Sequence, residues 1–455
     1  MKKTKTSRRS FFKTATYGAL GTMSIPAILT GCSQSTSKEE KLKEVAVPEI
    51  LGKAPDGKPL KAGLVGCGGR GTGAAVNFLD AGSGLQITAL GDVFPDRLNS
   101  CRQTLKEKGQ NIPDEKCFIG FDAYQKVIDS DIDVVLLCTP PVFRPEHFEY
   151  AISKGKHCFI EKPCAVDPVG ARKMLVTGKQ AAQRNLSVIS GTIRRSQKDC
   201  IETYRRVAGG AIGTIVSAHV SRMGGALWFK KREKNWNDME YMIRNWVNFC
   251  WTSGDHIVEQ FIHEIDQMSW FIGNKNPVRA EATGGRQRRE TGDMFDFFSV
   301  EFVYDRGENS PLRAHCTARQ IDGCDNQTII MIYGTKGYTN CYNKIFNLDG
   351  TIAWEYPYPK EGDADQSMKV PDPFVQEHIR LVTAIRSGKM INDVEDLVKS
   401  TLMAIMGREA AYTGKFITWD QIMASTQKLG PDTYQFGPVP GIKEVIPIAG
   451  VPPKA

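Results

Sequence analysis

Glycines spaced for close contact with phosphate groups are the first residues whose types and spacing indicate a chemistry. The stretch Gly66-Cys67-Gly68-Gly69-Arg70-Gly71 follows an apolar run ending at Val65 and precedes a helical pattern from Ala74 to Asp80. In such a turn the first glycine permits a sharp bend, the second lets the backbone approach a pyrophosphate, and the third lets the helix pack closely on the strand. The N-terminus of the helix then faces the phosphates. We therefore predict that a dinucleotide binds at Gly66, Gly68, Gly69, Arg70 and Gly71.

A carboxylate follows at the end of the next apolar run, where Asp92 lies 21 residues beyond Gly71. A carboxylate there accepts hydrogen bonds from both ribose hydroxyls and repels a 2′-phosphate. This favours NAD over NADP as the cofactor. Arg97 is close enough in the sequence to weaken that preference, unless it lies on the surface or in an ion pair.

Two further motifs end predicted buried strands, at the edge of a sheet where ligands bind. Cys138-Thr139-Pro140-Pro141 ends the fourth strand, and Glu161-Lys162-Pro163 ends the fifth. Lys162 could be a solvated surface lysine, but a lysine at the end of a buried strand on this edge indicates a role in the site.

An acid and a histidine recur later at helical spacing. On one continuous helix, Glu259, His263 and Asp266 would share a face, since they stand at positions i, i+4 and i+7. Oxidation of a secondary alcohol needs a group that takes the hydroxyl proton, and histidine suits that role near neutral pH. His263 could instead be a buried, hydrogen-bonded histidine. Glu259 and His263 could bind a metal, but no third ligand is evident, so we predict no metal site.

Aromatic residues precede this pattern in the segment Arg244-Asn245-Trp246-Val247-Asn248-Phe249-Cys250-Trp251. Aromatic faces beside fixed polar groups suit a pyranose, whose axial C–H face is apolar and whose rim carries hydroxyls. Trp246 and Trp251 are therefore candidate substrate contacts, although core packing explains either one equally well.

The chain shows two successive hydrophobic patterns, which predict the elements that position these residues. Short apolar runs alternate with helical patterns up to about residue 192, which is typical of a parallel sheet with crossover helices. Longer, partly alternating strands then indicate a mainly antiparallel open sheet. We therefore predict an α/β protein with an N-terminal Rossmann domain (59–192), a C-terminal α+β domain (193–430) and a tail (431–455). Strands are predicted at 62–65, 86–90, 134–138, 158–160 and 188–190, then at 215–220, 297–304, 312–318 and 328–333. Two late helical patterns, 373–387 and 393–413, are expected to pack back across the domains.

The order of these motifs resembles the Gfo/Idh/MocA oxidoreductases, which take their name from glucose–fructose oxidoreductase and inositol dehydrogenase. The resemblance rests on the glycine turn, Asp92, Thr139-Pro140-Pro141, His147, Gly155-Lys156-His157 and Glu161-Lys162-Pro163. It implies a nucleotide site that includes Thr139, Pro140, His147 and Glu161.

The resemblance also implies roles near the reacting carbon. Lys162 would lie beside the nicotinamide and the substrate, the peptide after it would be cis, and His263 would act as the base. Family members similar to inositol dehydrogenase usually carry Asp where this chain has Glu259. After the sixth strand the family often supplies substrate contacts, so we expect one from Arg194 or Arg195. Oligomers are common in the family through the open face of the second sheet, so we expect a homo-oligomer.

The N-terminus predicts export from the cytoplasm. Ser7-Arg8-Arg9-Ser10-Phe11-Phe12-Lys13 is a twin-arginine motif, and residues 1–31 have the three parts of a signal peptide. Leu29-Thr30-Gly31-Cys32 matches a lipobox, which predicts a lipid anchor on Cys32, the alternative being cleavage without a lipid. Residues 32–58 lack apolar periodicity and are expected to form a flexible tether.

Charge and cysteine usage agree with an exported enzyme that folds before export. Removing the six basic residues of the signal from the net charge of +8 leaves +2, which gives no argument for nucleic-acid binding. The twelve cysteines are scattered, without a Cys-x-x-Cys pair, so we expect few disulfides and no structural zinc.

Together these features favour a periplasmic oxidoreductase whose cofactor travels inside the protein. We expect NAD, tightly bound and recycled in place, and a sugar or glycoside whose secondary hydroxyl is oxidised, with C3 as one candidate position. The alternative is an NAD-dependent glycoside hydrolase, similar to α-N-acetylgalactosaminidases, that oxidises, eliminates, adds water and reduces again. A binding protein that kept the fold without the chemistry is the third reading. We expect the protein to contact a membrane only through the lipid anchor at Cys32.

Overall fold

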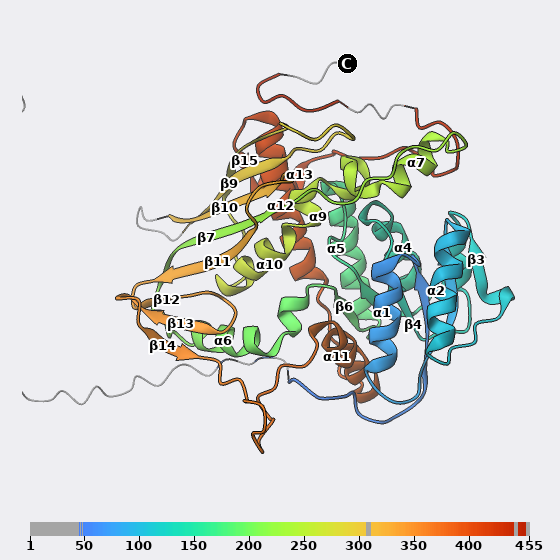
Figure 1. The fold of residues 1–455 in the computed structure, drawn as a ribbon, viewed down its shortest axis with the longest axis horizontal. Coiled ribbons are helices and arrows are strands. Elements are labelled where there is room, and N and C mark those ends of the chain that lie inside the picture. The colour runs from blue at the N-terminus through green and yellow to red at the C-terminus, as the bar shows by residue number, and fades with distance from the viewer. Residues whose placement is uncertain (1–44, 46, 48, 306–310, 441–444, 452–455) are drawn as a thin grey trace, which may run out of the picture. The chain divides into compact units, whose positions relative to one another are not determined.

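The first sheet has six parallel strands in the order β3-β2-β1-β4-β5-β6 (Figure 1). The computed structural model describes residues 45, 47, 49–305, 311–440 and 445–451, so the export signal and Cys32 lie outside the described residues. The five strands predicted from apolar runs are present, and the three-residue β3 is an addition. The strands are β1 (Leu60–Val65), β2 (Leu85–Asp92), β3 (Cys117–Ile119), β4 (Val134–Leu137), β5 (His157–Ile160) and β6 (Val188–Ser190).

Helices cover this sheet because its strands are apolar on both faces. All four residues of β4 are buried, as are five of the six in β1, and strands buried on both faces need helices on both sides. The helices are α1 (Gly69–Asp80), α2 (Pro95–Glu107), α3 (Ala123–Ile128), α4 (Arg144–Ser153) and α5 (Pro168–Gln183). Helix α1 begins at Gly69, five residues before the predicted start, so the glycines form its first turn.

The second sheet has nine strands in the order β14-β13-β12-β11-β7-β10-β9-β8-β15, and only the β7–β10 pair is parallel. This confirms the prediction of a mainly antiparallel sheet. The four predicted strands correspond to β7 (Ile215–Gly224), β9 (Phe297–Tyr304), β10 (Leu312–Gln320) and β11 (Gln327–Gly334). The others are β8 (Arg279–Gly285), β12 (Gly337–Thr339), β13 (Lys344–Asn347), β14 (Ile352–Glu355) and β15 (Ile417–Thr418).

Five helices lie between β6 and β8 in the chain. Two of them, α9 and α10, carry the acid and histidine singled out above. The five are α6 (Lys198–Ala208), α7 (Asp238–Arg244), α8 (Cys250–Ser253), α9 (His256–Glu259) and α10 (Ile262–Phe271).

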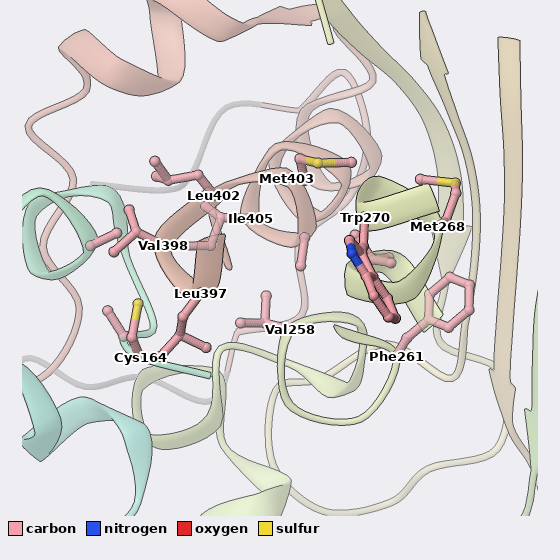
Figure 2. Packing of buried hydrophobic residues seen from close by; sticks show 14 of the residues in the cluster. Cys164, Val258, Phe261, Met268, Trp270, Leu397, Val398, Leu402, Met403 and Ile405 are labelled. Carbon is pink, nitrogen blue, oxygen red and sulfur yellow. The ribbon is translucent and has the colours of Figure 1, made fainter. Parts of the chain in front are cut away.

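Two long helices lie near the C-terminal end, and one of them, α12, joins the two sheets. Helix α12 (Val394–Thr413) packs against α5 of the first part and against α9, α10 and β8 of the second. Figure 2 shows its side chains Leu397 and Val398 near Cys164, in the same buried cluster as Trp270 of α10. Helix α11 (Pro373–Ser387) instead packs on α1 and β6, so it completes the core of the first sheet although it follows the second in the chain.

The short α13 (Trp419–Ala424) closes the helical part. Within the described ranges, no helix is both long enough and apolar enough to cross a membrane.

Candidate functional site

The glycine turn between β1 and α1 has the geometry of a phosphate-binding turn. Gly66 has φ +96°, a backbone conformation that favours glycine, and its N–H donates to the Gly91 carbonyl. A Cβ on Gly71 would lie 1.8 Å from the Gly66 carbonyl oxygen, so only glycine permits this approach of helix to strand. A Cβ on Gly68 or Gly69 would meet nothing within 4 Å, which leaves the helix N-terminus open to a phosphate.

A cavity of about 810 Å³ lies over this turn and has walls from both parts of the chain. The Rossmann part contributes the glycine turn, the ends of β2 and β4, and side chains after β3. The segment after β7 contributes a wall of which only Trp246 was a sequence candidate: Trp228, Phe229, Lys230, Ile243, Arg244 and Trp246.

Asp92 lines this cavity at the end of β2. Its carboxylate accepts the backbone N–H of Cys67 at 2.7 Å and of Phe94 at 2.9 Å, which fixes it beside the glycine turn. Burial raises the pKa of this carboxyl, against those two hydrogen bonds. Each oxygen keeps a lone pair for a ribose hydroxyl, so the position fits the role predicted for it.

Thr139, Pro140 and His147 line the same cavity. The Thr139 hydroxyl and His147 Nδ1 are 3.3 Å apart, and the His147 ring stacks on Tyr124 with centroids 4.1 Å apart. Burial lowers the pKa of His147 to about 3. His147 is therefore a neutral imidazole near pH 7 and orients Thr139 instead of carrying charge.

Arg70 lines the cavity but forms ion pairs on the protein side. Its Nε donates to Glu161, its Nη2 lies 3.6 Å from Glu377 of α11, and its guanidinium stacks on Phe374. The Glu161 carboxylate also accepts the backbone N–H of Lys162 at 3.1 Å. Glu161 is thus a residue that positions the strand end, and Glu377, which no sequence pattern indicated, completes the cluster.

Lys162 and Glu259 form a buried pair where the two parts of the chain meet. The Lys162 ammonium donates to Glu259 Oε1 at 2.9 Å and to the Glu259 backbone carbonyl. Burial opposes ionisation of Glu259, but the charge of Lys162 and hydrogen bonds from Lys162 and Gln260 outweigh it, so the pKa of this carboxyl is lowered. The Lys162–Pro163 peptide is cis, as the resemblance implies.

His263 lies in the first turn of α10, half-buried. Burial, followed by the nearby charges of Lys162, Arg222 and Arg194, lowers its pKa well below the ordinary value. His263 is therefore unprotonated at neutral pH, the state that a proton acceptor needs. Neither Lys162, Glu259 nor His263 lines the large cavity.

The prediction of one continuous helix from Glu259 to Asp266 is wrong. Helix α9 ends at Glu259 and α10 begins at Ile262, and the Phe261 N–H bonds back to His256 across five residues. No glycine or proline marks this break. Gln260 instead turns its side chain to Glu259 and to Arg222 of β7, so tertiary contacts outweigh helix propensity. The three residues do not act as one face.

Asp266 accordingly contacts a different partner, Arg195. The Arg195 guanidinium lies 2.9 Å from Asp266 and 2.8 Å from Asp396, and Ser400 donates to Asp266 at 2.6 Å. These contacts join the segment after β6 to α10 and α12. Arg195 and Asp266 therefore have structural partners that account for both.

Arg194 has no such partner. It donates to Gln197 at 2.7 Å and lies 4.8 Å from the centroid of the Tyr342 ring, and no carboxylate pairs with it among the described residues. Of the two arginines, Arg194 is the one available to a substrate.

The two candidate tryptophans lie in different environments. Trp246 is half-buried and lines the large cavity beside Trp228. Trp251 is 2% exposed and stacks on Tyr434, so it belongs to the core. The described residues hold no group of three His, Cys, Asp or Glu side chains placed to bind a metal ion.

A polar network missed by sequence reasoning connects β7 to this region. Arg222 pairs with Glu264 at 2.9 Å and donates to Gln260 at 3.3 Å. Through Gln260 it reaches Glu259 and Lys162. No sequence pattern predicted this set, because an arginine on a strand and an acid on a helix 42 positions later have no diagnostic spacing.

A glycine turn under a dinucleotide-sized cavity, on a sheet of order β3-β2-β1-β4-β5-β6, defines a Rossmann-type nucleotide-binding protein. Residues 60–190 match the model of the Gfo/Idh/MocA family, described as an oxidoreductase family with an NAD-binding Rossmann fold. This match places the nucleotide-binding part of the chain in the Gfo/Idh/MocA family.

The chain is also similar, at modest sequence identity, to curated oxidoreductase and glycosyl hydrolase proteins. An uncharacterized oxidoreductase of Streptococcus pneumoniae is 25% identical over 64% of this chain and 71% of its own length. A glycosyl hydrolase family 109 protein of Shewanella pealeana is 25% identical over 60% of this chain, but only 59% of that protein is covered.

A solved structure extends the likeness beyond the nucleotide-binding part. It is the scyllo-inositol dehydrogenase of Lactobacillus casei with bound NAD(H) and scyllo-inositol, which covers 79% of this chain and 99% of its own with a TM-score of 0.58. At 21% identity the likeness supports the fold.

Proposed function

We propose that this chain is an NAD-dependent oxidoreductase that removes hydride from a secondary hydroxyl of a sugar or glycoside, with C3 as the favoured position. The observation that carries the proposal is the Lys162–Glu259 pair at the ligand edge of the NAD-binding sheet, with a neutral histidine, His263, close enough for the charge of Lys162 to lower its pKa. The similarity to a protein that binds NAD(H) and an inositol supports a polyol-like substrate.

The nucleotide site fits NAD. The open approach at Gly68, the N-terminus of α1 and Asp92 would hold the pyrophosphate and the adenosine ribose. When bound, the nicotinamide supplies the acceptor for the hydride.

The chain's own residues manage the proton and the developing charge. Lys162 Nζ would donate a hydrogen bond to the reacting oxygen and stabilise negative charge as the C–H bond breaks. His263 would accept the hydroxyl proton, which gives a ketone and an imidazolium. Glu259 holds the lysine in place, and Arg194 is free to contact the sugar rim.

We further propose that the cofactor stays bound and is restored in place by a second sugar or keto-sugar. Exported twin-arginine proteins leave the cytoplasm folded, and the space beyond the inner membrane has no soluble nicotinamide pool. Export to the periplasm and lipidation of Cys32 are part of this proposal. They are tested by locating the wild type and the Cys32→Ser variant in membrane and soluble fractions.

A second candidate function is favoured by the family 109 relatives. Oxidation at C3 acidifies the neighbouring C–H bond, which prepares elimination of the aglycone, addition of water and reduction. One enzyme could then hydrolyse a glycoside with no net change in its NAD.

Product analysis separates the two functions. The purified protein is incubated with aryl glycosides and the products are followed by mass spectrometry. Accumulation of keto-glycoside or of enzyme-bound NADH supports the dehydrogenase, whereas free sugar without keto product supports the hydrolase. Absence of both, with the nucleotide bound, contradicts the proposed function.

We also propose a homo-oligomer formed through the open face of the second sheet. Exposed apolar side chains on its strands, such as Phe297, Tyr333 and Ile352, would be buried in that contact. Light scattering of the purified protein gives the oligomer number, and a monomer at micromolar concentration contradicts the proposal.

A further inference from the structure

The wall that the second part of the chain contributes to the nucleotide cavity exposes two large aromatic side chains. Trp228 and Phe229 each have a relative exposure of 47% although they line the cavity. Side chains of this size release much apolar surface from water when they are covered. A ligand in the cavity would complete that burial.

This wall is held in place before any ligand arrives. The buried Asn245 accepts the Lys230 N–H at 2.7 Å and donates to the Lys230 carbonyl at 3.0 Å. The amide of Asn248 donates to the Trp228 carbonyl at 3.0 Å. The backbone of Trp228-Phe229-Lys230 is thus fixed at both ends, which lowers the entropy cost of binding.

The wall is also fastened to the adenosine end of the cavity. Arg244 pairs with Asp96, at the start of α2, at 3.0 Å, and its guanidinium lies 3.9 Å from the centroid of the Phe94 ring. Lys230 and Arg97 both line the cavity here, and burial and the guanidinium groups of Arg97 and Arg244 lower the pKa of Lys230. Phe94, Asp96 and Arg97 follow Asp92 directly, where a dinucleotide's adenosine ribose lies.

The C-terminal segment packs over the same corner. Phe436 contacts Phe121 with ring centroids 5.1 Å apart, and the Met239 N–H donates to the Gly437 carbonyl at 3.1 Å. Figure 1 shows the C-terminal segment running beside α7. Two segments, the wall around Trp228 and the C-terminal segment around Phe436, therefore cover the side from which a nucleotide would leave.

We infer that residues 226–246 form an adenosine clamp, in which Trp228 and Phe229 stack against the adenosine half of the bound dinucleotide and slow its release. The inference rests on the proposed NAD cofactor and names the residues that retain it. Stacking of a base on an aromatic side chain is sequence-tolerant and strong enough to change a dissociation rate about tenfold or more. Arg97 and Lys230, which have no carboxylate partner among the described residues, add positive charge toward the phosphates.

The test compares nucleotide retention in the full chain. Wild type, the double variant Trp228→Ala/Phe229→Ala and the matched control Phe416→Ala are purified and dialysed, and bound nucleotide is measured by mass spectrometry. Phe416 is 64% exposed and does not line the cavity, so it controls for loss of a surface aromatic. The dissociation rate of NADH is then measured by displacement with excess NAD.

The clamp predicts that the double variant loses nucleotide on dialysis and releases NADH about tenfold faster or more, whereas Phe416→Ala does not. Trp228→Phe, which keeps an aromatic face, should retain the wild-type rate within about threefold. Equal retention and equal rates in wild type and double variant would overturn the clamp, as would equal losses in the Phe416 control.

The result is separable from the proposed function. If retention depends on Trp228 and Phe229 but no sugar or glycoside is converted, the clamp stands and the proposed reaction fails. If sugars are oxidised with a nucleotide that exchanges freely in both proteins, the reaction stands and the clamp fails.

Discussion

The Lys162 ammonium and the Glu259 carboxylate lie 2.9 Å apart, each less than a tenth exposed, although they come from opposite parts of the chain. Lys162 lies two residues beyond the end of β5 in the first sheet, and Glu259 ends α9. A buried ion pair contributes little stability by itself, but it leaves a costly charge when one partner is removed. The pair therefore fixes a proton donor where the two parts meet.

Substitution of Lys162 should abolish most turnover without releasing the nucleotide. Lys162→Met removes the donor that stabilises charge on the reacting oxygen, so kcat should fall about 10²- to 10³-fold. Nucleotide content, measured by mass spectrometry, should stay near that of the wild type, because the cavity residues are untouched. Unchanged turnover would show that the proposed assignment of Lys162 is wrong.

Removal of Glu259 should act on stability as well. Glu259→Ala leaves the Lys162 ammonium buried without its carboxylate, which should lower the free energy of unfolding by about 3–5 kcal/mol. The double variant Lys162→Met/Glu259→Ala removes both charges and should recover much of that loss, and it completes a double-mutant cycle with the wild type, Lys162→Met and Glu259→Ala. Denaturant unfolding of the four proteins gives the coupling, and additive effects would contradict it.

Substitutions of the adjacent Arg194 and Arg195 should have different effects, one on sugar binding and the other on stability. Arg194→Ala should raise KM about tenfold with an unchanged melting temperature, because Arg194 pairs with no carboxylate in the described part of the chain. Arg195→Ala should lower the melting temperature, because it leaves Asp266 buried and unpaired. Sugar kinetics and thermal unfolding of both variants check this, and a reversed pattern would assign the sugar contact to Arg195.

A buried histidine behind the first sheet should make folding sensitive to acid. His378 packs between Phe78 and Phe159, and burial followed by the charge of Arg70 lowers its pKa to about 3. Between pH 6.5 and 3 the unfolded chain binds a proton there that the folded chain does not, so stability falls as pH falls through this window.

The variant His378→Leu removes this contribution. From pH 7 to pH 5 it should lose about 2 kcal/mol less of its unfolding free energy than the wild type. Urea unfolding at the two pH values measures the difference. Parallel losses in both proteins would mean that His378 is charged in the folded state.

Asp92 should control the choice between NAD and NADP. In Asp92→Ser the carboxylate that repels a 2′-phosphate is gone, while Arg97 and Lys230 still line the cavity. The affinity for NADP relative to NAD should rise at least about tenfold, a change of about 1.4 kcal/mol. Calorimetry on nucleotide-stripped protein tests this, with the exposed Asp131→Ser as control. An unchanged preference would exclude Asp92 as the determinant.

Local sequence patterns predicted the elements but not the contacts between distant ones. The apolar runs before Gly66 and Glu161 identified their strands because burial on both faces leaves no polar position. The Arg244–Asp96 pair joins residues 148 positions apart and has no local signal. The same holds for the Arg222–Glu264 pair and for the break after Glu259, which tertiary contacts impose on a helix-compatible sequence. The cavity wall from the second part was therefore largely unforeseen.

The position of α11 has a consequence for how the protein is made. Its Ile379, Leu381 and Val382 belong to the same buried cluster as β1 and α1, yet they are translated about three hundred residues later. The first sheet cannot complete its native core until this helix has been synthesised, so the nucleotide-binding half closes late in synthesis. A chain shortened before Pro373 would leave this face of the sheet without α11 and prone to aggregation.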